Sequence, residues 1–253
     1  MRTLWTFLVV ALATCTLGPT VLVAALFRVR DRPNGVYQWC MHTWARLGVW
    51  AAGVQVVLHN PERMSPTEGV VYIANHVSWF DVLALASVLP RYSFVAKSEL
   101  RRIPVFGPAA GAAGIVYLDR ENRKQAFESY RGAADQVRSG KSVVVYPEGT
   151  RGREYALRPF KKGPFVLAIA SQAPIVPTVI YGAREVMPRG SFRVRAGVIH
   201  VHFLEPVPTA GMTYDRRGDV MTLVWRRMSE ALHEHYGIRI PERSIAKRNE
   251  RVI

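Results

Sequence analysis

The pattern of apolar and polar positions divides the chain into an apolar N-terminal stretch and a longer region of short alternating segments. Residues 3–27 contain no charged side chain, and a run of this length can cross a bilayer as a tilted helix. Pro19 lies within it and is compatible with a kinked or re-entrant helix. A signal peptide is the alternative, but its apolar core is shorter and ends at a cleavage site of small residues. The stretch leads instead into Arg28, Arg30 and Arg32, a cationic flank that favours a retained membrane helix with the following body in the cytoplasm.

A second apolar stretch covers residues 35–58, in which Arg46 is the single charged residue. It is rich in aromatic side chains, namely Tyr37, Trp39, Trp44 and Trp50. Aromatic residues are typical of the membrane–water interface, so we interpret the stretch as an amphipathic or semi-embedded helix beside the first. Packing of these rings on a soluble domain is the alternative. Residues 1–58 are therefore predicted to form a membrane-attachment segment of two helices.

Beyond residue 58 short apolar runs alternate with helical patterns. The runs rich in branched or aromatic residues predict strands at Val70–Ala74, Ser93–Lys97, Ile115–Asp119, Ser142–Tyr146, Ile175–Tyr181 and Val198–Leu204. Helices are predicted between and after them, over 80–89, 121–138, 164–172 and 215–236. This alternation predicts an α/β fold, with a mostly parallel or mixed sheet flanked by helices, over residues 59–238. Residues 239–253 form a basic tail, interpreted as a solvated end or a contact with the membrane surface.

The charge balance points to an anionic partner. The chain has 34 Lys and Arg against 19 Asp and Glu, a formal net charge of +15. This excess suits nucleic acid, an acidic membrane surface or a phosphorylated substrate. The apolar N-terminal segment and the absence of a recognisable nucleic-acid-binding motif argue against nucleic acid. Cys15 and Cys40 make neither a disulfide framework nor a zinc set, and are interpreted as small hydrophobic residues.

His76 and Asp81 follow the strand predicted to end at Ala74, with four residues between them. A histidine oriented by a carboxylate can act as a general base toward a hydroxyl. On one regular helix the two side chains would diverge by roughly 140°. They can meet if His76 lies in the loop and Asp81 in the first helical turn, with Ser78 as N-cap. The same Ser78-x-x-Asp81 pattern is the alternative, a capping box in which Asp81 binds backbone amides only.

A second group of polar residues, Glu148-Gly149-Thr150-Arg151, follows the strand predicted at Ser142–Tyr146. The glycine allows close backbone approach, and the arginine offers a planar fork that matches phosphate oxygens. Glu148 is predicted either to bind a substrate hydroxyl or to orient Arg151. A polar turn with a local ion pair is the alternative.

Further cationic residues fall at the ends of predicted elements. Lys97 ends one strand, Arg120 follows another, and Lys161 lies just before a helix that Gly163-Pro164 is predicted to begin. Amines and helix N-termini favour anions, so these positions predict one shared anion site. Solvated surface is the alternative for each of them singly. Two histidines, His200 and His202, share one face of a predicted strand, but no further ligand cluster accompanies them, so no metal site is predicted.

Taken in order, these motifs resemble those of the glycerolipid acyltransferases, specifically the bacterial 1-acylglycerol-3-phosphate acyltransferases. Asn75-His76 with Asp81 is similar to the first motif of that family, and Pro147-Glu148-Gly149-Thr150-Arg151 to the third. The segments between and after them also resemble the family, at Phe94–Gly107, Gly114–Arg120, Phe160–Gly163 and Ala173–Pro177. The resemblance covers about residues 70–181.

The resemblance implies a membrane-bound enzyme that makes phosphatidic acid without a cofactor or a metal. His76, oriented by Asp81, would take the proton from the free hydroxyl of lysophosphatidic acid as it attacks an acyl thioester, either acyl-CoA or acyl carrier protein. Arg120, Glu148, Gly149 and Arg151, with Thr150 beside them, would hold the acceptor, and Lys97 and Lys161 would add positive charge. The expected location is the inner membrane, in contact with membrane lipids, with the catalytic domain in the cytoplasm. The alternatives are another acceptor, such as lyso-ornithine lipid, and a non-catalytic lipid-binding protein.

Overall fold

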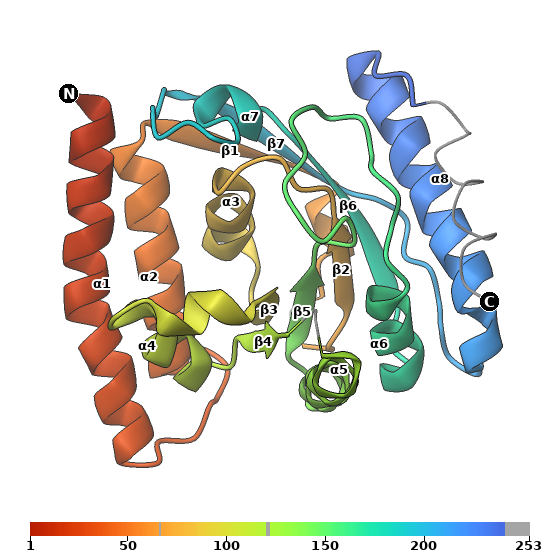
Figure 1. The fold of residues 1–253 in the computed structure, drawn as a ribbon, viewed down its shortest axis with the longest axis horizontal. Helices are drawn as coiled ribbons and strands as arrows, with labels where there is room; N and C mark the ends of the chain where they lie inside the picture. Colours follow the sequence, from red (N-terminus) through yellow and green to blue (C-terminus); the bar gives the residue numbers. More distant parts are fainter. Residues whose placement is uncertain (66, 120–121, 241–253) are drawn as a thin grey trace.

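The protein is built around one mixed β-sheet, as shown by a computed structural model that describes residues 1–65, 67–119 and 122–240. The strand order is β1-β7-β6-β2-β5-β3-β4 (Figure 1). The strands are β1 (Val54–His59), β2 (Val71–Ala74), β3 (Tyr92–Lys97), β4 (Val116–Leu118), β5 (Ser142–Val145), β6 (Ile175–Tyr181) and β7 (Gly197–Phe203). Neighbouring strands are parallel except β6 and β7, which pair antiparallel. The predicted α/β fold with a mixed sheet is confirmed.

Helices cover both faces of the sheet (Figure 1). The longer ones are α1 (Arg2–Leu26), α2 (Val36–Ala51), α3 (Phe80–Val88), α5 (Arg123–Arg138), α6 (Gly163–Ser171) and α8 (Arg217–Tyr236). The short ones are α4 (Phe106–Ala112), α7 (Ala183–Val186) and the 3₁₀ turns η1 (Pro61–Arg63), η2 (Ser98–Arg102) and η3 (Tyr214–Arg216). Helices α2 and α3 pack into one core, and α5, α6 and α8 into another on the opposite face. The four longer helices predicted after residue 80 are thus all present.

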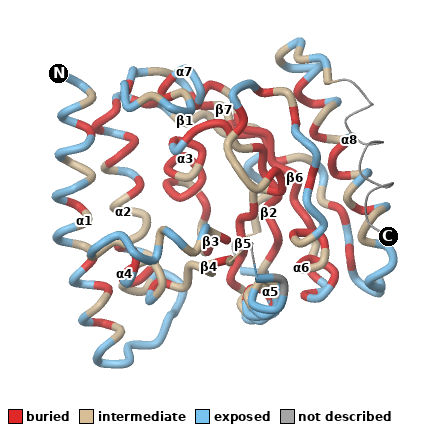
Figure 2. Tube along the Cα trace, in the orientation of Figure 1, coloured by how far each residue is buried: buried red, intermediate tan, exposed pale blue. Residues whose placement is uncertain are grey.

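The central strands alternate their side chains between these two cores. In β2, Val71 and Ile73 join the core under α5, α6 and α8, whereas Tyr72 joins the core under α3. In β5, Val143 and Val144 divide in the same way. Strands that are covered on both faces have no solvent-facing positions, which explains why their sequences are continuous apolar runs (Figure 2).

The N-terminal region differs from the prediction in two respects. Among the described residues, α1 is the one helix long and apolar enough to cross a membrane by length and composition, so there is one such helix and not two. The second predicted helix ends at Ala51, and the residues that follow Gly53 form strand β1, which pairs with β7. Gly53 has a φ of +64°, a conformation that ends the helix and redirects the chain into the sheet. The sheet therefore begins before residue 59, within the segment that we assigned to membrane attachment.

Helix α1 lies alongside α2, and both pack against α4 (Figure 1). Their shared small core includes Val21 and Ala24 of α1, Cys40 of α2 and Ala109 of α4. Cys40 is buried there and Cys15 is exposed, and both thiols are free. Of the predicted basic tail, residues 241–253 lie outside the described residues.

Candidate active site

His76 and Asp81 meet at the carboxyl-terminal edge of the central strands. His76 lies in the loop after β2, and Asp81 lies in the first turn of α3. The His76 Nδ1 to Asp81 Oδ2 distance is 2.8 Å. The Asp81 side chain is fully buried, and that of His76 is 14% exposed. With Asp81 ionised and the imidazole neutral, Nδ1 donates to the carboxylate, and Nε2 then carries the lone pair that can accept a proton.

The Asp81 carboxylate also binds the backbone of the loop that precedes its helix. Oδ2 accepts hydrogen bonds from the backbone amides of Val77, at 2.6 Å, and Ser78, at 2.7 Å. One oxygen atom of Asp81 therefore contacts both the His76 imidazole and the backbone amides of the loop, and the catalytic role of the pair stays a prediction. The expected N-cap differs, because α3 begins at Phe80 rather than directly after Ser78. The Ser78 hydroxyl accepts from the Phe80 amide and donates to the Met187 carbonyl.

Asn75 fixes the start of the same loop. Its side-chain amide donates to the carbonyl of Ile180 at 2.9 Å, and its side-chain carbonyl accepts from the Ile180 amide at 2.7 Å. This pair of bonds ties the end of β2 to the neighbouring strand β6, and Asn75 is buried. A residue held in this way fixes where the chain leaves the sheet, and hence where His76 begins its loop.

The loop after β5 holds the backbone of His76 from both sides. Glu148 Oε1 accepts from the His76 amide at 3.0 Å, and the Gly152 amide donates to the His76 carbonyl at 2.7 Å. The other Glu148 oxygen accepts from the Arg158 amide at 3.3 Å. The loops meet because β2 and β5 are parallel neighbours, whose carboxyl ends lie at one edge of the sheet.

Glu148 is thus a positioning residue for the His76 loop. The sequence predicts that it binds a substrate hydroxyl or orients Arg151. In the structure its carboxylate contacts the backbone amides of His76 and Arg158, and the hydroxyl role stays a prediction. Burial is the main cause that raises the pKa of the Glu148 carboxyl to about 7, although the two amide bonds act in the opposite direction. The nearby charge of Asp81 raises it further.

Tyr146 lies against His76 and was not among the site residues predicted from the sequence. Its ring stacks on the His76 imidazole, with centroids 4.0 Å apart and planes 18° apart. Burial raises the pKa of the Tyr146 phenol well above its ordinary value, and the charge of Asp81 adds to this rise. The phenol therefore stays neutral, and the ring restricts the motion of the imidazole on one face. The signal available in the sequence was an aromatic residue directly before Pro147-Glu148.

Arg151 and Lys161 both lie in the segment between β5 and α6. The Arg151 guanidinium lies over the Trp79 ring, 5.0 Å from its centroid, so Trp79 rather than Glu148 orients it. Burial lowers the pKa of Arg151, and the charge of Arg189 lowers it further. Gly149 has a φ of +74°, and a Cβ atom there would lie 2.9 Å from Cε of Lys161. The lysine chain therefore passes directly over the glycine.

The remaining predicted residues are distributed around this edge of the sheet. Lys97 ends β3, the neighbour of β5, and its Nζ lies 3.4 Å from Oε1 of Glu99. Thr150 is half-buried between Gly149 and Arg151. Arg120 lies outside the described residues, so its place in the site stays a prediction. Of the residues predicted to share one anion site, Arg151 and Lys161 thus lie at one loop and Lys97 lies at the end of the next strand, and the site itself stays a prediction.

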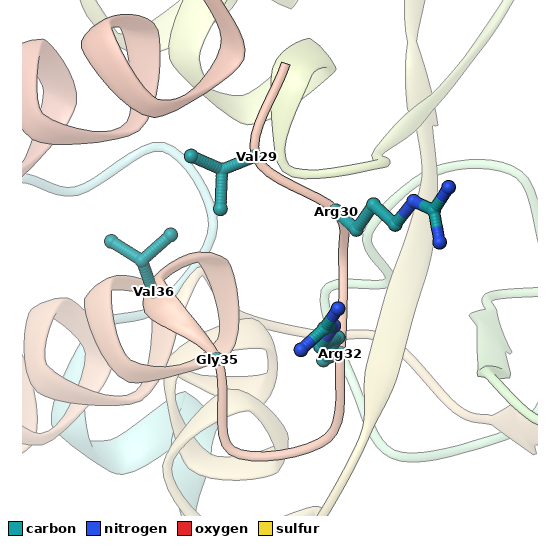
Figure 3. Close-up of a pocket in the computed structure, with 5 residues that line it drawn as sticks. All are labelled: Val29, Arg30, Arg32, Gly35 and Val36. Atoms are coloured by element: carbon teal, nitrogen blue, oxygen red, sulfur yellow. The ribbon is translucent and has the colours of Figure 1, made fainter. Parts of the chain in front are cut away.

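Two other features of the molecule lie away from this edge. A hollow of about 370 Å³ lies at the turn between α1 and α2, where the side chains of Val29 and Val36 point toward each other and Arg30 points away (Figure 3). In the lateral strand pair β1–β7, His59 Nε2 lies 3.0 Å from Nδ1 of His200. Within the described residues no group of three or more His, Cys, Asp or Glu side chains is arranged to hold a metal ion.

Comparison with known proteins identifies the family. A sequence profile of the family described as Acyltransferase matches residues 55–181, a span that includes His76, Asp81 and the loop after β5. The chain belongs to the acyltransferase family. A putative 1-acyl-sn-glycerol-3-phosphate acyltransferase of Caenorhabditis elegans is 29% identical to this acyltransferase over 220 residues, which are 86% of this chain and 74% of the worm protein.

Human 1-acyl-sn-glycerol-3-phosphate acyltransferase alpha is 34% identical over 165 residues, which are 64% of this chain and 58% of the human protein. This acyltransferase therefore spans somewhat more than half of the human relative. The fold is similar to the crystal structure of the 1-acyl-sn-glycerophosphate acyltransferase PlsC from Thermotoga maritima, with a TM-score of 0.77 and 21% sequence identity. That similarity covers 94% of this chain and 97% of the other.

Proposed function

We propose that this acyltransferase transfers a fatty acyl group to the sn-2 hydroxyl of 1-acylglycerol-3-phosphate and thereby forms phosphatidic acid. The observation that carries the proposal is the 2.8 Å contact between His76 Nδ1 and Asp81 Oδ2, which supports a histidine base oriented by a carboxylate. The names of the C. elegans, human and T. maritima proteins support the acceptor, since all three denote enzymes that act on this lysolipid.

In the proposed reaction His76 is the general base. Its Nε2 takes the proton of the acceptor hydroxyl while the hydroxyl oxygen attacks the thioester carbonyl carbon. The carbon–sulfur bond then breaks, and the departing thiolate receives the proton from the imidazolium. The buried Asp81 carboxylate stabilises the imidazolium that forms between these two steps. No covalent acyl-enzyme is needed, because the acceptor oxygen attacks the thioester directly.

The basic side chains would bind the phosphate of the acceptor. Arg151, held over Trp79, offers two parallel donors to phosphate oxygens. Lys161 beside Gly149, Lys97 at the next strand end and Arg120 would add positive charge, with Thr150 as a hydroxyl donor. The donor is an anionic thioester, acyl-CoA or acyl carrier protein, and the net charge of +15 suits either of them.

Helix α1 would attach the enzyme to the inner membrane, with the catalytic domain in the cytoplasm. The domain holds this helix at both ends: Arg2 Nη1 donates to the Ala52 carbonyl at 2.9 Å, and Lys141 Nζ donates at 3.0 Å to Asp31, just beyond the helix. A helix that crossed the bilayer would place these two ends on opposite sides of the membrane. Contact of both ends with one domain therefore favours a helix that lies along the domain within one leaflet.

The test is acyl transfer from labelled acyl-CoA to 1-acylglycerol-3-phosphate in membranes. We expect His76→Ala to abolish product formation and His233→Ala to leave it unchanged, because His233 is exposed on α8. Equal expression and thermal unfolding of the variants would show that folding is intact. Activity retained in His76→Ala would contradict the proposed base.

Two alternatives predict different outcomes of the same assay. An acceptor such as lyso-ornithine lipid predicts that product forms with that lysolipid, still dependent on His76, and not with 1-acylglycerol-3-phosphate. A non-catalytic lipid-binding protein predicts no transfer to any acceptor, together with lipid binding that His76→Ala leaves unchanged. Repeating the assay with acyl carrier protein as the donor separates donor preference from absence of activity.

A further inference from the structure

The loop between α7 and β7 combines a projecting aromatic ring with positive charge. Phe192 is 78% exposed, and Arg189, Arg193 and Arg195 are exposed around it. From Val186 to Leu204 the sequence contains no Asp or Glu. The reaction proposed above assigns no role to this exposed phenylalanine or to the three arginines. We call residues 188–196 the arginine–aromatic loop.

This loop is joined to the N-terminal end of α1. The Val194 amide donates to the Thr3 hydroxyl at 3.0 Å, and the ring of Phe192 lies 6.3 Å from that of Phe7. Trp5 of α1 and Trp50 of α2 lie 6.0 Å apart in the same region and are both exposed. Phe192 therefore extends the row of exposed apolar side chains on α1, which includes Leu4, Phe7 and Leu8.

We infer that the arginine–aromatic loop is a second membrane contact, which docks on the headgroup region of a bilayer that contains anionic lipids. Aromatic rings favour the interface, and exposed arginines beside them bind lipid phosphates. The surface is continuous with α1, so α1 and the loop would reach the same leaflet together. The inference rests on the membrane attachment of α1 proposed above.

The docked loop would also connect the membrane surface to the active site. Arg189 Nη1 donates to the Arg151 carbonyl at 2.6 Å, and Arg151 is the residue assigned to the acceptor phosphate. A lysolipid that leaves the bilayer beside this loop would meet Arg189 and then Arg151. The loop thus gives the acceptor a short path from the headgroup layer to the phosphate-binding residues.

The test places a fluorescent label on the loop of the full chain. In a Cys15→Ser, Cys40→Ala background, Phe192→Cys is labelled with an environment-sensitive fluorophore, and Tyr214→Cys serves as the matched control. Tyr214 is also an exposed aromatic residue, but it lies in η3 directly before α8. Helix α8 lies on the side of the molecule away from α1 (Figure 1). Each protein is mixed with vesicles of phosphatidylcholine, with or without phosphatidylglycerol, and separated by flotation.

We expect the label at 192 to shift its emission to the blue and to be quenched by nitroxide-bearing lipids in phosphatidylglycerol vesicles, and the label at 214 to do neither. Arg193→Gln with Arg195→Gln should weaken docking of the loop by about fivefold per arginine, with α1 still attached. A floated protein whose label at 192 stays open to aqueous iodide would overturn the inference. Failure to float would overturn both the attachment of α1 and the inference, so the two failures are distinguishable.

Discussion

The buried carboxyl of Glu148 makes the stability of the protein depend on pH, and Glu148→Gln isolates this effect. The pKa of the folded carboxyl is raised to about 7 from an ordinary value of 4.5, mainly because burial disfavours the ionised form. The unfolded chain therefore releases this proton near pH 4.5, whereas the folded chain keeps it until about pH 7. The contribution of this carboxyl to the free energy of unfolding is fully present below its pKa in the unfolded chain. The contribution is lost as the pH rises through its pKa in the folded chain.

The size of the effect follows from the two pKa values. At about 1.4 kcal/mol per pH unit, the rise from 4.5 to about 7 corresponds to about 3 kcal/mol of stability lost between these values. Glutamine does not ionise, and its side-chain oxygen can still accept the hydrogen bond of the His76 amide. The free energy of unfolding of Glu148→Gln minus that of wild type should therefore be about 3 kcal/mol larger at pH 8 than near pH 4.5.

The assay is thermal unfolding of the detergent-solubilised proteins, followed by circular dichroism between pH 4.5 and 8.5. For a chain of this size the gain corresponds to about 6–12 °C in the unfolding midpoint, relative to wild type. Glu154→Gln is the matched control, because Glu154 lies in the same loop but is exposed, and it should show no such trend. A difference between Glu148→Gln and wild type that stays constant with pH would refute the reasoning.

Three further variants test the site. Asp81→Asn should keep the fold but lower kcat by about 10³–10⁴-fold, because an amide cannot hold His76 in the reactive tautomer; steady-state kinetics beside thermal unfolding separates the two effects. Gly149→Ala should lower the free energy of unfolding by about 1–2 kcal/mol, measured by chemical denaturation, because it forces a positive φ and displaces Lys161. Arg151→Lys should raise KM for the lysolipid about tenfold with kcat little changed, because lysine cannot donate a bidentate pair to phosphate; equal KM values would contradict that role.

The strands could be predicted from the sequence because their local pattern matches their environment. The central strands are covered on both faces, and their uninterrupted branched residues predict strands without knowledge of the partner. Strand β1 was missed because its local apolar pattern does not differ from that of the helix before it. Val54–His59 follows directly on an aromatic-rich helix, so the apolar pattern continues while the secondary structure changes at Gly53. That glycine and the valines after it were the available signal.

The long-range contacts of the site could not be predicted from the sequence. Glu148 and His76 are 72 residues apart, and their contact depends on β2 and β5 being neighbours in the sheet. The same adjacency places Tyr146 on the imidazole. Spacing along the chain identifies residues that suit the chemistry, but strand order decides which of them touch. This is why Glu148, for which orientation of Arg151 was one of two predicted roles, supports the backbone of His76.

Asp81 shows why two interpretations of one motif need not compete. Its Oδ2 atom accepts from the imidazole and from the amides of Val77 and Ser78, so the bonds to the loop backbone also fix the carboxylate against His76. A carboxylate held only by the histidine could rotate and lose that alignment, whereas here rotation would break backbone bonds in a buried site. These backbone bonds are therefore part of the proposed catalytic geometry. The closeness of His76 and Asp81 in sequence follows from them, because one short turn must supply the histidine, the two amides and the carboxylate.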